Sequence, residues 1–385
     1  MDPELKNSLV RLRGYVEAEG FKGYDPYDAL NSPLLEKLTL GRKWPRIAAL
    51  QLMKRSPVNL RPLLGVPKGF NPKALGLFLW SYGKLYRRDQ APLLLERIEF
   101  FLDRLTETRS PGISGNGWGY NFDWQSRAFF VPRNTPTVVN SAFIGHALLD
   151  VYEWTGKERC LELAAPIGDF ILHDLKRLPD GDHFSFSYTP LDDYAVHNAN
   201  LLGASLLIRL HQLAGLKGAR DAALTALACS MKHQREDGSW WYAERATSHW
   251  IDSFHTGFNL QAIRTFFRAD EGVTHREGYE KGVAYYANRF FDESGQPSYY
   301  HDRVYPIDVH APSQAMVFFS EEPAHRTLAN RIGLWMCRNL QDDAGYFYFQ
   351  KTRRYVNKVP YMRWGQAWAM HGLTHLYLHA GENPK

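Results

Sequence analysis

The sequence repeats itself, and this repeat restricts the possible folds more than any other feature does. A glycine with neighbouring aromatic residues recurs at Gly181, Gly238, Gly295 and Gly345, at intervals of 57, 57 and 50 residues. An amphipathic segment of helical length precedes each of these turns, and a second apolar segment of helical length follows it. The repeating unit is therefore predicted to be a helix, a glycine-aromatic turn and a second helix.

Six such helical pairs can be counted along the chain. They are 44–55 with 71–86, 91–107 with 136–154, 157–177 with 193–213, 217–236 with 251–269, 275–291 with 309–320, and 323–341 with 362–379. An open solenoid would need polar capping repeats, whereas the last helix, AWAMHGLTHLYLHA, is as apolar as the middle ones. We therefore predict an all-α fold, a closed (α/α)6 toroid with short β-hairpins at its rim. A single domain is expected over 1–385, with 1–43 as an N-terminal extension that packs on the ring.

Cysteine content, hydropathy and charge exclude several classes of protein. The cysteines, Cys160, Cys229 and Cys337, are too few and too far apart for a disulfide framework or a cysteine-based zinc site. Because no apolar run approaches the length of a membrane span and the N-terminus lacks a signal sequence, we expect a cytoplasmic protein. A net charge of +5 without a Lys/Arg block indicates no nucleic-acid partner.

One position of the repeat carries polar or aromatic side chains where each inner helix begins. Aligning the repeats brings five residues into this column, namely Asn140, His197, His255, His310 and Trp364. In a ring of helical pairs, the turns that precede the inner helices emerge at the same end, so the column is expected to converge on one mouth of the ring. The helix N-termini gathered there would favour anionic groups such as a uronate carboxylate or a phosphate.

The column and the turns before it supply the candidate site residues. We expect the catalytic groups to be Asp252, His255, His310, His197 and Asp123. The expected substrate-binding side chains are Trp124, Arg133, Asn140, Asp193, Tyr194, Trp240, Trp241, Tyr242, Tyr305 and Trp364. The aromatic content of 14 % exceeds what a core alone needs, which favours rings that line a wet surface. The alternative interpretation is that the histidines cap or pack helices and recur through duplication.

Several short motifs resemble those of known toroid proteins. The ring is similar to that of glycoside hydrolases, polysaccharide lyases, sugar epimerases, terpenoid cyclases and protein prenyltransferases. QREDGSWW resembles the Q-x-x-x-G-x-W repeat of the cyclases, and QDDAGYFYF is a weaker copy. GFKGYDPYDALNSP, FVPRNTPTVVNSAFIGHALLD and WIDSFHTGFNL resemble the VpsJ-like proteins of bacterial polysaccharide-biosynthesis loci. This resemblance implies a role in polysaccharide biosynthesis, and it brings no mechanism with it.

The sequence also departs from two families of this fold. Terpenoid cyclases protonate their substrate with an Asp-x-Asp-Asp acid, and LDDY at 191–194 lacks its first aspartate. Protein prenyltransferases bind zinc through an Asp, a Cys and a His of inner helices, whereas the cysteines here fall in expected outer helices. Both departures disfavour isoprenoid chemistry.

Two catalytic chemistries on sugars remain open. Glycosidic hydrolysis needs two carboxylates, for which the candidates are Asp123, Asp193, Asp252 and Asp308. Lyase or epimerase chemistry needs a group that removes a proton beside a carboxyl or carbonyl near neutral pH. For that step the chain offers His255, His310, Tyr194 and Tyr305, with Arg133 or Arg303 to neutralise a carboxylate.

A metal role and a role without catalysis are the remaining alternatives. The column histidines come from separate helices without an H-x-x-x-H spacing, so we expect neither a metal nor another cofactor. The ring could also hold a glycan or a lipid-linked glycan without turnover. Because inner positions near the mouth are polar, they favour an oligo- or polysaccharide, including an anionic one, over an isoprenoid. The sequence thus favours an enzyme that cleaves or epimerises a glycan.

Overall fold

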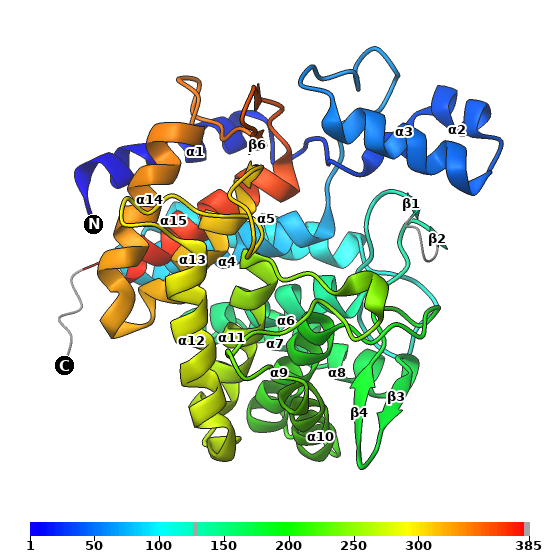
Figure 1. Ribbon diagram of the computed structural model, residues 1–385, viewed down its shortest axis with the longest axis vertical. Helices are drawn as coiled ribbons and strands as arrows, with labels where there is room; N and C mark the ends of the chain where they lie inside the picture. Colours follow the sequence, from blue (N-terminus) through cyan, green and yellow to red (C-terminus); the bar gives the residue numbers. More distant parts are fainter. Residues whose placement is uncertain (126–129, 381–385) are drawn as a thin grey trace.

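The fold is a closed ring of inner helices (Figure 1). The computed structural model describes residues 1–125 and 130–380. Each inner helix packs against the next, and the last packs against the first. In order around the ring they are α4 (Pro72–Asp89), α6 (Val138–Thr155), α9 (His197–Ala214), α11 (Ser253–Arg268), α13 (His310–Ser320) and α15 (Trp368–His379), the last preceded by the π-helical turn η6 (Met362–Ala367). The predicted all-α (α/α)6 toroid is therefore confirmed.

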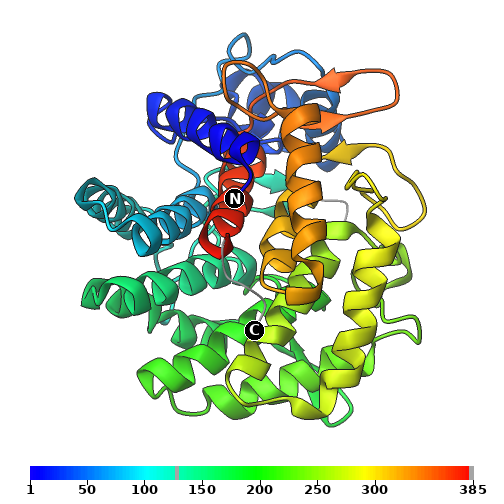
Figure 2. The ribbon, with the colours of Figure 1, turned by 90° about the vertical axis from the view of Figure 1, so that its left-hand side faces the viewer.

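An outer layer of helices covers this ring. Each outer helix packs on the inner helix that precedes it in the chain. These helices are α5 (Pro92–Glu107), α7 (Glu158–Ala164) with α8 (Ile167–Asp169) and η2 (Phe170–Asp174), α10 (Ala219–Lys232), α12 (Arg276–Phe290) and α14 (Arg326–Leu340). The N-terminal helix α1 (Pro3–Ala18) takes the remaining outer position, where it packs on α15 and α14 (Figures 1 and 2, blue beside red and orange). The two ends of the described chain thus close the ring together.

The expected pairing of 44–55 with 71–86 is wrong. The segment forms α3 (Lys43–Arg55), which packs on η1 (Asp28–Asn31) and α2 (Pro33–Thr39) in a separate small hydrophobic cluster. This insertion projects from the ring at one end (Figure 1). Its amphipathic pattern is that of a helix, but the partner face belongs to the insertion and not to α4. The division of the chain into a single domain over 1–385 stays a prediction.

At three of the four repeated glycines, Gly238, Gly295 and Gly345, a turn meets the backbone of the next outer helix. Gly345 has φ of +97°, and a Cβ placed on it would lie 2.5 Å from the carbonyl oxygen of Arg11 in α1. Gly238 has φ of +87° and stands in the same relation to Lys281 in α12. Because α1 and α12 meet equivalent glycines, α1 occupies an outer-helix position of the repeat.

The glutamine of the Q-x-x-x-G-x-W motif has a structural role. Gln234 Nε2 donates to the carbonyl oxygens of Gly238, at 2.9 Å, and of Gly278 in α12, at 2.7 Å. Gln341 Nε2 donates in the same way to Gly345, at 2.9 Å, and to Ser8 in α1, at 3.1 Å. The motif therefore ties a turn to the following outer helix, which explains its recurrence without any role in catalysis.

Replacing Gly345 by alanine is expected to destabilise the ring at its closure. The substitution places a Cβ at a positive φ and against a backbone oxygen, which should cost about 2–4 kcal/mol of unfolding free energy. Denaturant unfolding measures this loss. The matched control is Gly215→Ala, because Gly215 has φ of +64° with nothing within 4 Å of the added Cβ. Equal losses in the two variants would contradict the contact with α1.

Short strands and capped helix starts shape one end of the ring. The strands form the hairpins β1 (Trp124–Gln125) with β2 (Phe130–Val131) and β3 (Arg177–Asp180) with β4 (His183–Phe186), and a small sheet of β5 (Ile307–Asp308), β6 (Gln350–Lys351) and β7 (Val356–Asn357). Side chains of Asn71, Thr137 and Asp252 accept hydrogen bonds from the first turns of α4, α6 and α11. The rim hairpins are therefore confirmed. Within the described residues, no helix combines the length and hydropathy needed to cross a membrane.

Candidate functional site

A cavity of about 270 Å³ opens where the inner helices begin. All the inner helices or their N-terminal turns contribute to it, and the insertion adds Tyr27 and Lys54. Its polar and aromatic wall comprises Tyr27, Lys54, Lys73, Tyr120, Phe122, Trp124, Tyr188, Asn198, Tyr242, Trp250, Asp252, Phe254, His255, Phe258, Tyr299, Tyr300, His310, Arg363 and Trp364. Aromatic faces combined with a few polar groups are typical of sites that bind sugar rings and their hydroxyl groups.

Asp252 and His255 form a hydrogen-bonded pair in this wall. Asp252 caps α11, since its Oδ1 accepts a hydrogen bond from the backbone N–H of His255 at 3.0 Å. Its Oδ2 lies 2.6 Å from Nδ1 of the same histidine, and the carboxylate is 2 % exposed. The carboxylate assigns the ring proton to Nδ1, so Nε2 of the neutral imidazole is the nitrogen that can accept another proton.

His310 lies beside this pair and shares an aromatic neighbour with it. The ring of His310 stacks on Phe254 at 4.4 Å, and the ring of His255 packs on Phe254 at 4.2 Å. Neither ring nitrogen of His310 has a hydrogen-bond partner among the described residues. Burial, with the positive charges of Lys73 and Arg363 nearby, lowers the pKa of His310 well below its usual value. His310 is therefore a neutral imidazole with unused hydrogen-bonding capacity.

Asp308 holds two of the wall residues in place. Its Oδ1 accepts hydrogen bonds from the indole Nε1 of Trp364 at 2.7 Å and from the backbone N–H of His310 at 2.9 Å. The carboxyl is 1 % exposed, and burial raises its pKa to about 6. Asp308 thus orients Trp364 and His310 from behind, and it is not itself part of the cavity wall.

Asp308→Asn is expected to remove a pH-dependent loss of stability. The pKa of Asp308 in the folded protein is about 6, above its usual 3.8. The stabilisation that its protonated carboxyl gives to the folded state is therefore fully present below pH 4 and is lost as pH rises through 6. Since each pKa unit corresponds to about 1.4 kcal/mol, the variant should match the wild type near pH 4 and exceed it by about 2–3 kcal/mol near pH 8. Denaturant unfolding at both values measures the difference. A constant difference between the two proteins would refute the expectation.

Two buried basic side chains also reach the cavity. Lys73, at the start of α4, is 3 % exposed, with its Nζ over the rings of Phe143 and Phe258. Burial and the charge of Arg363 lower the pKa of Lys73 well below its usual value. Arg363 makes a two-pronged ion pair with the Asp25 carboxylate, at 2.5 and 2.8 Å. The wall therefore holds a permanent guanidinium and an amine whose charged form burial disfavours.

The structure brings six of the expected site residues into the cavity wall. They are Asp252, His255, His310, Trp124, Tyr242 and Trp364. The others lie outside the wall. Of these residues outside the wall, His197 is tested by a variant in the Discussion.

The remaining candidates have contacts of other kinds. His197 Nε2 lies 2.8 Å from Glu244, and Trp240 is buried and donates from Nε1 to the backbone oxygen of Ser230. Trp241 stacks on His249. The carboxylate of Asp193 pairs with exposed Arg245, and the hydroxyl of Tyr194 contacts Ser248. Rim packing and turn formation account for these positions.

The last four candidates lie around the hairpin of β1 and β2, in the inner helix α6 that follows it, or beside the small sheet. Asp123 Oδ1 accepts from the backbone N–H of Arg133 at 2.7 Å, which closes the hairpin, and the Arg133 residue is exposed. Asn140 is fully buried, and its side-chain amide has no hydrogen-bond partner among the described residues. Tyr305 is half-buried beside the guanidinium of Arg353. None of the four lines the cavity.

Sequence reasoning missed the cationic and several aromatic parts of the wall. Lys73 carried a usable signal, because a lysine in the first turn of an otherwise apolar helix opposes the helix dipole and is costly unless it has a function. Arg363 directly precedes Trp364 of the column. The insertion residues Tyr27 and Lys54 had no such signal, because nothing in the repeat predicts which loop folds over the mouth.

Comparison with known proteins supports the fold. No family model matches the chain, and no curated protein matches it. Among solved structures it is similar to cellobiose 2-epimerase from Bacillus thermoamylovorans, with a TM-score of 0.61 and 11 % identity over 82 % of this chain and 90 % of that one. It is also similar to the GH76 α-mannanase BT2949 of Bacteroides thetaiotaomicron, with a TM-score of 0.60 and 13 % identity over 80 % and 85 %.

A third similar structure is an unsaturated glucuronyl hydrolase specific for heparin, with a TM-score of 0.58 and 12 % identity over 81 % of this chain and 87 % of that one. These three proteins have different activities. Their sequence identity to this chain is so low that the similarity establishes the fold alone. The toroid is thus shared by an epimerase and by hydrolases, so the fold by itself assigns no activity to this chain.

Proposed function

We propose that this protein is a carbohydrate-active enzyme that epimerises a sugar by moving a proton at a carbon next to a carbonyl. The observation that carries the proposal is the arrangement of two histidines on the same aromatic ring, Phe254. His255 is supported by the buried carboxylate of Asp252, and His310 is neutral with both nitrogens unused. Two such imidazoles can serve two faces of one carbon, which is what inversion of a stereocentre requires.

The proton balance follows from the environments of the two rings. His310 accepts the proton from the sugar carbon, and the electron pair of the broken C–H bond moves onto the adjacent carbonyl oxygen. His255, protonated at Nε2, returns a proton to the opposite face, since the Asp252 carboxylate stabilises its imidazolium. The guanidinium of Arg363 and the amine of Lys73 are the groups in the wall suited to stabilise the negative oxygen that forms in between.

Hydrolysis is less well supported by the same residues. Glycosidic hydrolysis uses two carboxyl groups about 5–9.5 Å apart on either side of the bond. Among the described residues, the cavity wall holds one carboxylate, Asp252, and both of its oxygens accept hydrogen bonds from His255. Asp308 lies behind the wall and is occupied by Trp364 and His310.

The substrate class is proposed from the composition of the wall. Phenols of Tyr188, Tyr242 and Tyr299 have their pKa raised by burial, so they remain donors for sugar hydroxyl oxygens. The cations Arg363 and Lys54 favour a sugar that carries a carboxylate. The resemblance to VpsJ-like proteins supports polysaccharide biosynthesis as the setting. A glycan-binding protein without turnover is the alternative, and the same aromatic wall would serve it.

A product screen distinguishes these functions. The purified protein is incubated with cellobiose, a mannobiose and a glucuronate-containing disaccharide, and the products are read by carbon and proton NMR. We expect a new epimer of one reducing sugar, with the glycosidic bond intact. Released monosaccharides would indicate a hydrolase, and an unsaturated uronate would indicate a lyase. A saturable change in thermal stability without any product would support the binding protein.

A further inference from the structure

A second cavity lies at the opposite end of the ring, where the inner helices end. It has a volume of about 220 Å³, and among the described residues it shares no wall residue with the first cavity. Its wall is strongly polar, with Asp150, Glu153, Arg209, Gln261, Arg268, Glu321, His146 and His375. The proposed sugar chemistry uses none of these groups.

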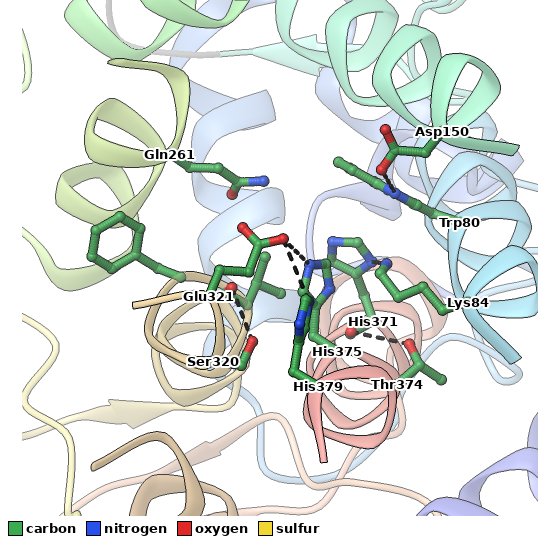
Figure 3. A network of polar contacts seen from close by, with 12 residues as sticks. Trp80, Lys84, Asp150, Gln261, Ser320, Glu321, His371, Thr374, His375 and His379 are labelled. Carbon is green, nitrogen blue, oxygen red and sulfur yellow. Dashed lines mark hydrogen bonds and ion pairs between the residues drawn. The ribbon is translucent and has the colours of Figure 1, made fainter. Parts of the chain in front are cut away.

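Three metal-ligating side chains meet beside this cavity (Figure 3). Glu321 directly follows α13, while His375 and His379 lie four residues apart on one face of α15. One ligand atom from each residue lies within 4.8 Å of the other two. Among the residues that the structure describes, this is the one group of three such side chains that could hold a metal ion. The side chains are 14 %, 4 % and 17 % exposed, so the group is largely buried.

The two oxygens of Glu321 have different partners. Oε2 faces the guanidinium groups of Arg264 and Arg268. Oε1 faces the two histidines, 3.4 Å from Nε2 of His375 and 3.7 Å from Nε2 of His379. The arginines therefore fix and orient the carboxylate through one oxygen and leave the other directed at the imidazoles. An outer partner that orients a ligand in this way is common at metal sites.

The distances fit metal ligation better than direct hydrogen bonds. An N–H···O hydrogen bond spans about 2.7–3.2 Å between heavy atoms, and both distances to Oε1 are longer. Ligands bound to Zn²⁺ at about 2.0–2.1 Å in a tetrahedron lie about 3.3–3.4 Å from one another. The separations of 3.4 and 3.7 Å between nitrogen and oxygen therefore leave room for an ion between these side chains with little movement.

We propose that Glu321, His375 and His379 bind one divalent transition-metal ion, with Zn²⁺ as the ion that best fits two imidazoles and one carboxylate. Glu321 and His375 also line the second cavity, so the fourth coordination position is open to a water molecule or a ligand there. The third histidine of α15, His371, is not a ligand, because its Nδ1 lies 3.0 Å from Nζ of Lys84 (Figure 3).

The sequence carries a signal for this site. The last helix reads HGLTHLYLH, in which histidines recur at every fourth position and so share one helical face. This proposal departs from the expectation of no metal, which was argued from the column histidines and did not consider this spacing in the last helix. The site is separate from the proposed sugar chemistry, and either can stand without the other.

Cobalt titration of the full-length, chelator-treated protein tests the proposal. Co²⁺ in a tetrahedral site with nitrogen and oxygen ligands gives intense visible absorption that octahedral aqueous Co²⁺ lacks. We expect this absorption to saturate at one ion per chain and to disappear when Zn²⁺ is added. His379→Gln should weaken binding by at least about tenfold, since loss of even an outer partner of a metal ligand costs that much.

The control is His173→Gln, because His173 is an exposed histidine of η2 far from the group in sequence. It should bind cobalt as the wild type does. Glu321→Gln provides a second ligand variant, and far-ultraviolet circular dichroism confirms that each variant is folded. No tetrahedral spectrum in the wild type, or equal binding by the wild type and a folded His379→Gln or Glu321→Gln variant, would overturn the proposal.

Discussion

His310→Gln is expected to lower the rate of sugar epimerisation by about 10³-fold while leaving the protein folded. General acid–base catalysis by one positioned group contributes about 10²–10⁴-fold, and glutamine cannot accept the proton. The effect should fall on kcat more than on KM, because the aromatic wall that binds the sugar remains. Steady-state kinetics with the substrate found by the product screen measures it, and the same loss is expected for His255→Gln.

The control for both variants is His197→Gln. His197 holds the same position in the repeat as His255 and His310, but it pairs with Glu244 and lies outside the cavity wall. Its replacement should leave kcat and KM within about twofold, although Glu244 loses a partner. If His197→Gln lost activity as the other two variants do, the column as a whole would matter, and the assignment from the cavity geometry would be wrong.

Lys73→Met is expected to stabilise the protein and to impair it as an enzyme. Burial lowers the pKa of Lys73 well below its usual value, so the charged ammonium is less stable in the folded protein than in the unfolded chain, and this difference favours unfolding. Methionine has a similar length and no charge to bury. We expect the unfolding free energy at pH 7 to rise by about 1–4 kcal/mol, the range seen when buried ionic groups are replaced by apolar ones.

The same substitution should lower kcat by about 10²-fold, because removal of one donor to a developing oxyanion has an effect of that size. The matched control is Lys84→Met. Lys84 is equally buried on α4, but it lies at the other end of the helix, against Trp80 and His371. Its loss should leave kcat unchanged. Denaturant unfolding and kinetics on both variants test the assignment, and loss of stability in Lys73→Met with full activity would refute it.

The spacing of the glycine-aromatic turns was sufficient to predict the ring. It was sufficient because three of the four repeated glycines, Gly238, Gly295 and Gly345, meet the backbone of the next outer helix, so their spacing reports the helix-pair geometry directly. The first pair could not be predicted in the same way. Helix α1 has the apolar spacing of an outer helix, but its partner α15 lies at the other end of the chain, and closure of a ring leaves no local signal.

The site was predicted in part for a related reason. Column residues such as His255, His310 and Trp364 share a repeat position, and the ring brings that position to one mouth. The groups that shape their chemistry follow no repeat. The ion pair of Asp25 with Arg363 joins residues 338 positions apart, and Tyr27 and Lys54 come from an insertion. His197 shows that a shared repeat position is not enough, because its side chain pairs with Glu244 and does not line the cavity.

Solvent deuterium exchange tests the central claim, that this cavity moves a proton at a sugar carbon, most directly. The protein is incubated in D2O with the reducing sugar that the product screen identifies, and deuterium at the carbon beside the carbonyl is followed by NMR. We expect deuterium to enter at that carbon in both epimers, and the exchange to be lost in His255→Gln and His310→Gln. Turnover without deuterium at that carbon, or exchange that persists in both variants, would contradict the account.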